Sequence, residues 1–491
     1  MVLTGYYLST AQEVKMMKQL FKTGAMMCCA GLLVVSAALS GSSVLAADGE
    51  DWSQFHGNEA HTGNSESAAP HTSNLFWQST DIGAVDASSV AIADGMVFVN
   101  CGDHISCLDE DNGVQLWSKP ITGGDSWGSW AGPAYDNGKV FISGTKVYAF
   151  DAVSGTPLWV YDMPNDACNG GPLAVNGKVY AGDWDGHHYY CLDANSTDPD
   201  GTLLWSFDMG GGYAQGTPAY YNGYIFLTGW SYPGGNVWCL DAITGAQVWH
   251  GQTTQDTCGS PMIADGKVWV TTYDFSDYGS VLAFDVDDIG GDGIGDIVWG
   301  PITIERSDST PAYHDGKIYV CGGCYGYSNQ GERTYCIDVA TESIVWQTPV
   351  GTETGALDVG NWTCSVAVAD GLVFVGKPVH GDAMYFDYQA VYALDASTGA
   401  EVWHYDHGGA HPSIADNTVF TVAEGKVWAF RDTTYPAWDV NEDGTINYLD
   451  LIRIGNHYGE SGAAGWIAED VNSDGTINYL DLIIIGNHYG E

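Results

Sequence analysis

Residues 391–403 read VYALDASTGAEVW, and residues 237–249 repeat this phrase as VWCLDAITGAQVW. In both copies apolar and polar side chains alternate on each side of a turn that ends in Thr-Gly, which predicts two antiparallel strands joined by a tight turn. A second phrase, P-x-x-x-x-G-x-V-[YF]-V, precedes the first and predicts another strand pair. Together the two phrases predict one four-stranded antiparallel sheet for each repeat.

These two phrases recur along most of the chain, with a spacing of about 46 residues. A period of this length with four strands is typical of propeller blades. The glycine of the second phrase, or an Asn in its place, lies at Gly95, Gly138, Gly177, Gly223, Gly266, Gly316, Gly371 and Asn417. The first phrase ends at Trp117, Trp159, Trp205, Trp249, Trp299, Trp346 and Trp403. The sequence therefore predicts an all-β fold, an eight-bladed β-propeller of four-stranded antiparallel blades over residues 74–432.

The two ends of the repeat region predict how the ring closes. The last copy stops at Asp432, before the strand that would carry its tryptophan, and residues 74–78 (NLFWQ) supply such a strand ahead of the first copy. An N-terminal strand that completes the last blade removes both open sheet edges. Trp77 is then the eighth blade tryptophan, and we expect all eight to pack between blades rather than to bind a cofactor.

The repeats, with the lead-in DWSQFHGNEAHTGNS at residues 51–65, resemble the pyrroloquinoline-quinone (PQQ) repeat family of eight-bladed propellers. That family includes quinoprotein dehydrogenases, outer-membrane assembly scaffolds and non-catalytic binders, so the resemblance implies a fold and leaves the function open. Its alcohol-oxidising members carry a disulfide between adjacent cysteines, and their quinone is held on the axis with a calcium ion and an aspartate base. Past residue 46 the sequence has no adjacent cysteine pair and no CxxCH haem motif. We therefore do not expect PQQ as a cofactor and assign no catalytic residue.

The C-terminal 53 residues carry one 21-residue phrase twice, as DVNEDGTINYLDLIRIGNHYG from Asp439 and as DVNSDGTINYLDLIIIGNHYG from Asp470. Oxygen-bearing side chains at loop positions 1, 3, 5, 9 and 12, with Gly at position 6, have the ligand spacing of an EF-hand calcium loop. The ligands expected in the first loop are Asp439, Asn441, Asp443, Thr445 through its carbonyl, Asn447 and Asp450. Those expected in the second loop are Asp470, Asn472, Asp474, Thr476 through its carbonyl, Asn478 and Asp481.

Both loops differ from ordinary EF-hands, because position 12 is Asp and no helix precedes either loop. The apolar spacing after each loop predicts a helix. A duplicated loop–helix unit of this kind resembles the type I dockerin module, a small all-α domain. The resemblance implies two calcium ions and a cohesin-bearing partner protein.

In dockerins the recognition residues lie at loop positions 10 and 11, which here are Tyr448, Leu449, Tyr479 and Leu480. By resemblance these four residues bind the cohesin, and the near-identical copies give two binding orientations. Many dockerins carry Ser or Thr at these positions, so the class of cohesin stays open. The alternative is that the four side chains are the packing faces of their helices. At position 8, Ile446 and Ile477 are expected to pair the two loops in a short β contact.

The charge and the N-terminus bear on location. With 61 acidic and 15 basic residues the formal net charge is −46, which should repel nucleic acid and anionic lipid. Three lysines before an apolar run at residues 25–39, and small or aliphatic residues at 44–46, predict a signal peptide over residues 1–46, with Met16 or Met17 as alternative starts. We expect a secreted protein with no membrane span in its mature chain, held at the cell surface through a cohesin. The expected parts are a lead-in at 47–73, the propeller at 74–432, a linker at 433–438 and the dockerin at 439–491.

Several other features leave alternatives open. Ten cysteines follow the signal peptide, and their pairing cannot be read from the sequence. Four of them share one repeat position, where we expect a small buried side chain, namely Cys107, Cys191, Cys239 and Cys336. Aromatic residues in Gly-rich loops either contact a sugar or protein ligand or pack over blade ends, and these are Trp127, Trp130, Trp184, Trp230, Tyr325 and Tyr327. The acidic insertion at 285–296 is expected to be a solvated loop.

Three functions remain in view. The leading hypothesis is a secreted, non-catalytic binding or scaffold protein whose propeller presents a protein- or carbohydrate-binding surface. The alternative is a polysaccharide hydrolase or lyase, and so a role in polysaccharide catabolism, which would need two carboxylates facing one cleft. A PQQ-dependent dehydrogenase is the second alternative.

Overall fold

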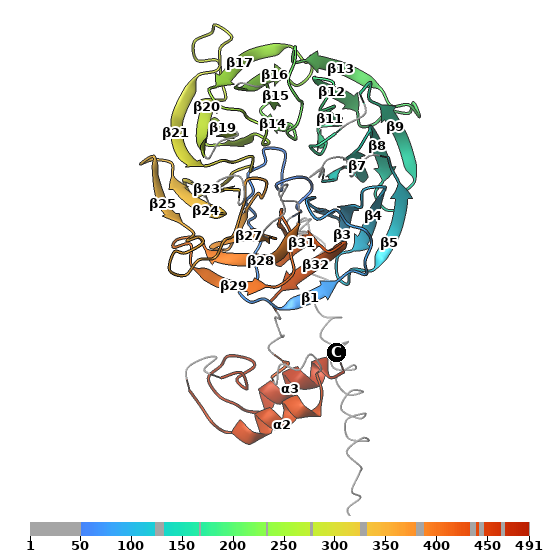
Figure 1. Ribbon diagram of the computed structural model, residues 1–491. Coiled ribbons are helices and arrows are strands. Elements are labelled where there is room, and N and C mark those ends of the chain that lie inside the picture. The colour runs from blue at the N-terminus through green and yellow to red at the C-terminus, as the bar shows by residue number, and fades with distance from the viewer. Residues whose placement is uncertain are drawn as a thin grey trace, which may run out of the picture. The chain divides into compact units, whose positions relative to one another are not determined.

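The computed structural model describes residues 51–122, 132–165, 168–231, 234–274, 278–324, 331–379, 387–432, 438–440, 446–462 and 467–490. It confirms the predicted propeller, because eight four-stranded antiparallel sheets form a ring (Figure 1). The predicted signal peptide lies outside the described residues, as do Trp127, Trp130, Tyr325, Tyr327, Asn441, Asp443 and Thr445.

Each blade runs from an innermost strand to an outermost one. The innermost strands are β2 (Ala91–Ala93), β6 (Ala134–Asp136), β10 (Leu173–Val175), β14 (Ala219–Tyr221), β18 (Met262–Ala264), β22 (Ala312–His314), β26 (Ala367–Ala369) and β30 (Ser413–Ala415). The second strands are β3 (Met96–Asn100), β7 (Lys139–Ser143), β11 (Lys178–Gly182), β15 (Tyr224–Trp230), β19 (Lys267–Tyr273), β23 (Lys317–Gly322), β27 (Leu372–Pro378) and β31 (Thr418–Ala423).

The outer half of each blade continues the same order. The third strands are β4 (His104–Asp109), β8 (Lys146–Asp151), β12 (His188–Asp193), β16 (Gly235–Asp241), β20 (Tyr278–Asp285), β24 (Arg333–Asp338), β28 (Tyr388–Asp395) and β32 (Lys426–Arg431). The outermost strands are β5 (Gln115–Pro120), β9 (Pro157–Asp162), β13 (Leu203–Asp208), β17 (Gln247–Thr253), β21 (Ile297–Glu305), β25 (Ser343–Gln347), β29 (Glu401–Tyr405) and β1 (Leu75–Gln78). Blades 1 to 8 are numbered from β2 onward, and β1 completes blade 8.

The turn between the first two strands of each blade explains the spaced glycines. Two residues with positive φ link these strands, as at Asp370 (φ 49°) and Gly371 (φ 75°) in blade 7. This is the two-residue hairpin turn that favours Asp-Gly and Asn-Gly. Blade 8 uses Asp416 and Asn417, with φ of 46° and 60°. Asn tolerates this left-handed backbone better than most other non-glycine residues, which accounts for its place in the eighth copy.

The eight blade tryptophans join each blade to the next one, as predicted. Every indole Nε1 donates a hydrogen bond of 2.7 to 3.5 Å to a backbone carbonyl beyond its own blade. The ring also packs on the following turn, since a Cβ placed on Gly399 would lie 2.5 Å from Trp346. The glycine of the Thr-Gly pair is therefore required by the neighbouring blade as well as by its own turn.

The ring closes through the predicted strand exchange. β1 pairs antiparallel with β32, with Trp77 opposite Ala429. In blade 7, Trp403 donates to the carbonyl of Pro70 at 2.8 Å, so the N-terminal segment supplies the acceptor that the next repeat supplies elsewhere. The carboxylate of Asp432 accepts hydrogen bonds from the backbone N–H groups of His71 (2.8 Å) and Thr72 (3.0 Å) and from the Thr72 hydroxyl. The two ends of the repeat region are thus fastened to each other.

The lead-in fills the centre of the ring, where Figure 1 shows it in blue. Seven innermost strands donate the N–H of their middle residue to it, over 2.7 to 3.1 Å. The donors and acceptors, in chain order, are Ile92 to Trp52 O, Tyr135 to Ser53 O, Ala174 to Gln54 Oε1, Tyr220 to Glu59 O, Ile263 to Ala60 O, Tyr313 to Thr62 O and Val368 to Gly63 O. Blade 8 joins through Asn417 N, which donates to Ser67 Oγ at 2.8 Å. One short segment therefore visits the eight blades in sequence order.

The C-terminal unit contains the two predicted helices, α2 (Tyr448–His457) and α3 (Tyr479–His488). Asn447 and Asn478 cap their N-termini, and a capping box forms with Asp450 and Asp481. A small core joins the two copies and contains Val440, Ile446, Ile454, Ile477 and Ile485. The repeated phrase thus folds twice in the same way around one shared core.

All ten cysteines that follow the predicted signal peptide lie in the described ranges as buried thiols, and none of them forms a disulfide. The four at the repeat position (Cys107, Cys191, Cys239 and Cys336) are fully buried on third strands, as expected. At this position the side chain faces a blade tryptophan across the strand pair, as Cys239 does Trp249. A small side chain fits there for that reason.

Loss of the Asp432 carboxylate should loosen ring closure. In Asp432→Ala the hydrogen-bond donors of residues 71 and 72 lose their acceptor, and the free energy of unfolding should fall by about 1–2 kcal/mol. Asp111→Ala, which removes an exposed carboxylate elsewhere on the rim, should change it by less than about 0.5 kcal/mol. Urea unfolding of the two variants and the wild type measures this, and equal midpoints for both variants would contradict the closure role.

Candidate functional site

In the second loop of the C-terminal unit, two carboxylates accept hydrogen bonds from the backbone of the loop itself. Asp470 accepts from the N–H groups of Asp474 (3.1 Å) and Gly475 (2.9 Å), and Asp481 accepts from those of Asn472 (3.1 Å) and Asn478 (2.8 Å). Asp470 and Asp481 are buried. These bonds close the loop and bring positions 1 and 12 of the expected ligand set onto its inner side.

The remaining positions of this loop have separate roles. Asn472 accepts from the Asp474 N–H at 2.9 Å, and Asp474 accepts from the Thr476 N–H at 2.8 Å. Asn478 uses its side-chain oxygen to cap α3 at Leu480 N (2.9 Å) and donates its Nδ2 to the Thr476 carbonyl (2.8 Å). With its oxygen engaged at the helix, Asn478 is suited to reach an ion through water rather than directly.

The residues of the loop fit a hard dication by type. All of the expected donors are oxygens, and three of them are carboxylates, which is what Ca²⁺ selects. Within the described ranges no three His, Cys, Asp or Glu side chains stand close enough together to hold a metal ion as they are. Binding an ion would draw the carboxylates away from some of their amide donors. Of the first loop, Asp439 and Asp450 are buried in the same way and Asn447 caps α2.

The four predicted recognition residues are exposed and lie outside the small core of the C-terminal unit. Tyr448 and Tyr479 are each 60% exposed, and Leu449 and Leu480 are each 40% exposed. The isoleucine one turn further along extends each patch, at Ile452 (51%) and Ile483 (36%). The two copies therefore present two similar apolar patches to solvent.

The expected β contact between Ile446 and Ile477 is replaced by a different pairing. Ile477 accepts from Gly459 N (2.8 Å) and donates to the Glu460 carbonyl (3.0 Å), so its partner is the segment after α2. Gly490 N donates to the Ile446 carbonyl (2.8 Å) in the matching place. Both isoleucines meet in the core through their side chains instead. These backbone hydrogen bonds link each loop to the segment that follows the helix of the other copy.

The two copies differ most where each loop meets the opposite helix. Trp438, just before the first loop, stacks on His488 with the ring centres 3.7 Å apart. Its counterpart before the second loop is Glu469, which pairs with Arg453 (3.2 Å) and lies 3.9 Å from His457. Arg453 in the first copy thus pairs with Glu469 before the second loop. The second copy has Ile484 in place of this arginine, and the first loop has Trp438 in place of this glutamate.

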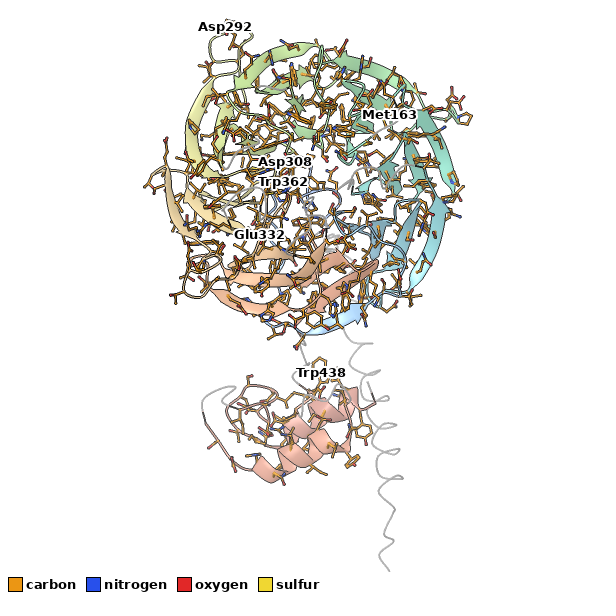
Figure 2. All side chains as sticks on the ribbon, in the orientation of Figure 1. Met163, Asp292, Asp308, Glu332, Trp362 and Trp438 are labelled. Carbon is orange, nitrogen blue, oxygen red and sulfur yellow. The ribbon has the colours of Figure 1, made fainter. Side chains whose placement is uncertain are left out.

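A second cluster of polar residues lies on the propeller axis, where Figure 2 labels Asp308 and Trp362. The Arg306 guanidinium lies 4.2 Å from the centre of the Trp362 ring and 5.5 Å from that of Tyr273, within range of a cation–π interaction. Gln215 Nε2 lies 3.5 Å from Asp308 Oδ2. The sequence reasoning missed this cluster, although the repeated G/S-S/T-P turns at 216–218, 259–261 and 309–311 mark loops that lead to innermost strands.

Burial shapes the acid–base character of the axis. Desolvation raises the pKa of Asp308 to about 7, and the nearby Arg306 charge opposes this rise. Just before β24, the third strand of blade 6, desolvation likewise raises the pKa of Glu332 to about 8, and the Asp358 charge adds to this rise. Such shifts occur at functional sites and also in buried structural networks, so they do not by themselves identify a reaction.

The cavity beside this axial cluster is too small for a large ligand. The cavity beside Phe55, Asp308, Thr363 and His411 has a volume of about 10 Å³, room for about one water molecule. The described axial side chains in this packing do not form a pocket for a tricyclic quinone. The lead-in contributes to this filling through Phe55, which is 2% exposed.

The aromatic loop residues that the structure describes pack over blade ends. Trp184 and Trp230 both lie against Tyr213, with ring centres 5.6 and 4.8 Å apart. Both tryptophans are half-buried. The acidic insertion folds back on itself, since Asp288 accepts from the N–H groups of Asp292 (3.2 Å) and Gly293 (2.8 Å). The two tryptophans thus pack on a neighbouring ring, and the acidic insertion bonds to its own backbone.

Comparison with known proteins agrees with this architecture. A family model described as outer membrane protein assembly factor BamB matches residues 102–198, 192–355 and 330–455, and the type I dockerin domain model matches residues 437–489. The crystal structure of BamB from Moraxella catarrhalis superposes with a TM-score of 0.52 and 16% identity, over 71% of this chain and 95% of that one. Quinohemoprotein alcohol dehydrogenase from Comamonas testosteroni superposes with a TM-score of 0.56 and 14% sequence identity, over 78% of this chain and 80% of that one. At these identities the likeness concerns the fold alone.

Among curated proteins, the serine/threonine-protein kinase AfsK of Streptomyces griseus is 31% identical over 133 residues, which is 25% of this chain and 16% of the kinase. The chain thus spans about a sixth of that relative's length. In the part of the chain that the structure describes, no helix has the length and apolar character needed to cross a membrane.

Replacing Asp308 by Asn should stabilise the protein in a pH-dependent way. The folded pKa of about 7 lies above the ordinary value of 3.8, so the unfolded chain releases this proton first and the wild type loses stability as the pH rises from 4 toward 7. The amide of the variant cannot ionise, so the melting temperature of Asp308→Asn should exceed that of the wild type at pH 8. At pH 4 the two should nearly coincide. A difference of the same size at both pH values would contradict the burial argument.

Proposed function

Because this chain belongs to the PQQ-repeat family described as outer membrane protein assembly factor BamB and carries a type I dockerin domain, we propose that it is a secreted, non-catalytic binding protein. Its dockerin attaches it to a cohesin-bearing partner in a calcium-dependent way, and its propeller presents a binding surface. The observation that carries the attachment is the pair of exposed Tyr-Leu patches, each set directly after a calcium-type loop on a capped helix.

The exposed patches support a protein partner. Tyrosine is enriched among residues that dominate binding energy, and apolar side chains at the start of both helices are otherwise costly to leave in water. The shared core fixes α2 and α3 to each other, so the patches are presented on a rigid unit. Each patch offers the same Tyr, Leu and Ile, which supports two binding orientations.

A calcium role for both loops is supported by their shared pattern of buried carboxylates at positions 1 and 12. Asp439 and Asp450 in the first loop match Asp470 and Asp481 in the second. Backbone N–H groups satisfy part of the hydrogen-bonding capacity of these carboxylates, and a bound cation would balance their negative charge. Calcium binding would therefore stabilise the folded unit to a degree that grows with calcium concentration.

Calcium titration of the full chain tests the loops. The wild type should bind two ions in this unit, and Asp470→Ala with Asp481→Ala should reduce the number to one, because the second loop loses both buried carboxylates. Ser473→Glu, which gives the second loop the position 4 residue of the first, should keep both ions. Isothermal titration calorimetry counts them, and an unchanged count in the double variant would defeat the ligand assignment.

Capture by immobilised cohesins tests attachment. Replacing Tyr448 and Leu449, or Tyr479 and Leu480, by Ala should each weaken capture by no more than about twofold, since the other patch remains. Replacing all four should weaken it by at least about 30-fold. Tyr458→Ala with Tyr489→Ala removes two other exposed tyrosines and should have no effect. Capture that persists after calcium is chelated, or that is unchanged in the variant with all four substitutions, would refute this mode of attachment.

A polysaccharide hydrolase or lyase is the second candidate, because one pocket of about 510 Å³ gathers carboxylates at the edge of blades 7 and 8. Asp86, Asp387, Asp406 and Glu424 line it with Lys377. Burial raises the pKa of Asp86, as a general acid would need. On our proposal the wild type releases no reducing ends from a polysaccharide panel. Release that disappears in Asp86→Asn would favour the enzyme instead.

A further inference from the structure

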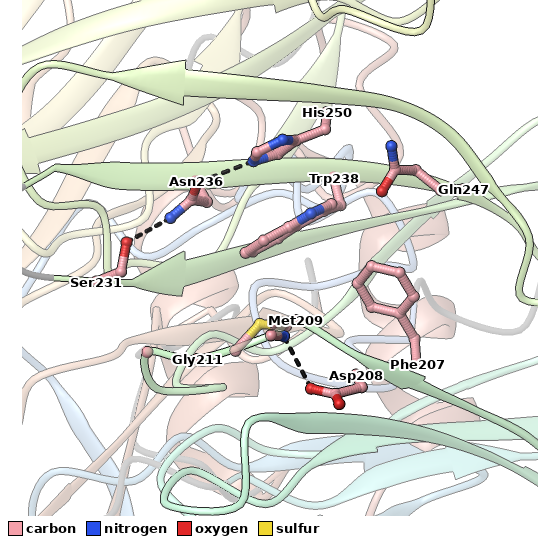
Figure 3. Close-up of a pocket in the computed structure, with 11 residues that line it drawn as sticks. Phe207, Asp208, Met209, Gly211, Ser231, Asn236, Trp238, Gln247 and His250 are labelled. Carbon is pink, nitrogen blue, oxygen red and sulfur yellow. Dashed lines mark hydrogen bonds between the residues drawn. The ribbon is translucent and has the colours of Figure 1, made fainter.

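A groove between blades 3 and 4 has the size and lining of a ligand site. Its volume is about 440 Å³, within the range of small-molecule pockets. Phe207, Asp208 and Met209 form one wall, and Asn236, Trp238 and His250 form the other. Figure 3 shows Trp238 between His250 and Met209.

A chain of hydrogen bonds fixes the chemistry of His250. Asn236 donates its Nδ2 to Ser231 Oγ at 2.6 Å, so its Oδ1 is left to accept from His250 Nε2 at 2.8 Å. With Nε2 carrying the proton, Nδ1 of the neutral ring is an acceptor. Burial lowers the pKa of His250, which favours this neutral form. The imidazole also stacks on Trp238, with ring centres 5.0 Å apart and planes at 10°.

Two other groups in the groove are not used by the fold. Neither Trp238 Nε1 nor the Gln247 amide forms a hydrogen bond within the described residues. The equivalent residues elsewhere do, because Trp428 Nε1 of blade 8 donates to the Ala423 carbonyl (3.1 Å) and Gln115 Nε2 of blade 1 donates to Ser106 Oγ (2.9 Å). Blade 4 thus keeps a donor and an amide available to a ligand.

The combination selects a neutral polyhydroxyl ligand. An indole N–H donor, an imidazole acceptor and a primary amide can bond hydroxyl groups in both directions, while Phe207, Met209 and Trp238 supply apolar walls. Asp208 brings a negative charge, and no Lys or Arg accompanies it among the described lining residues, so anions are disfavoured. We propose that this groove binds a neutral sugar chain. The inference rests on the proposed function, since it names the ligand of the propeller's binding surface.

Affinity electrophoresis of the full-length protein tests the groove. Native gels would contain xylan, galactomannan or mixed-linkage β-glucan as neutral probes and polygalacturonate as the anionic one. At least one neutral polysaccharide should retard the wild type, and polygalacturonate should not. Trp238→Phe and Gln247→Ala should each weaken binding of the retarding polysaccharide by about three- to ten-fold, the loss of one hydrogen-bonding group.

Variants at the equivalent positions of other blades distinguish loss of ligand binding in the groove from a general effect on the fold. Gln115→Ala and Trp428→Phe make the same changes at the equivalent positions of blades 1 and 8 and should bind like the wild type. Gln247 is exposed, so its variant keeps the test valid if Trp238→Phe proves unstable. Equal binding by all variants, retardation by polygalacturonate, or no retardation by any neutral probe would overturn the proposal.

Cohesin capture measured on the same preparations distinguishes this inference from the proposed attachment. Capture without any retardation would defeat the groove and leave the attachment standing. Retardation that depends on Gln247, without capture, would support the groove and defeat the attachment.

Discussion

The structure depends on satisfying the inner edges of eight small sheets around one axis. Each innermost strand is only three residues long, and the N–H of its middle residue would lack a partner at the inner sheet edge if no other segment lay there. The lead-in accepts seven of these N–H groups directly and meets the eighth blade through Ser67. A single segment thereby covers the inner sheet edge of seven of the eight blades. Ring closure at Pro70 and Asp432 then follows, because the same segment continues into β1.

This constraint also bears on function. The segment that pairs with the inner strands brings Phe55 to the axis, beside Asp308 and His411. The space left among them is about one water molecule in size. Two pockets of several hundred Å³ lie elsewhere, at the boundary of blades 3 and 4 and at that of blades 7 and 8. On our proposal, the propeller holds its ligand between blades rather than at this filled centre.

The fold was predictable from sequence because its signals are local and repeated. The Asp-Gly turns, the blade tryptophans and the N-terminal strand around Trp77 each depend on residues a few positions apart. The exposure of Tyr448 and Tyr479 was not decided by the sequence, since a helix start can face the core or solvent, and the structure was needed to choose. The pairing of Ile477 with Gly459 was missed for the same reason, because it depends on how two copies pack.

The sites on the propeller were beyond sequence reasoning for a different reason. Arg306 and Trp362 come from loops of neighbouring blades and meet only on the axis. Phe207 and His250 belong to different blades, and only the comparison of Trp238 with Trp428 shows that one indole N–H is left unused. Such sites arise from contacts between repeats, whereas the repeat pattern reports contacts within them.

Hydrogen–deuterium exchange of the full chain tests the central claim most directly, namely that a closed propeller carries a separate calcium-dependent attachment unit. Peptides covering residues 51–65 and the innermost strands should exchange only with global unfolding, with or without calcium. Peptides covering residues 467–490 should be protected in calcium and exchange much faster after chelation. Rapid exchange in residues 51–65, or protection of residues 467–490 that ignores calcium, would contradict the account.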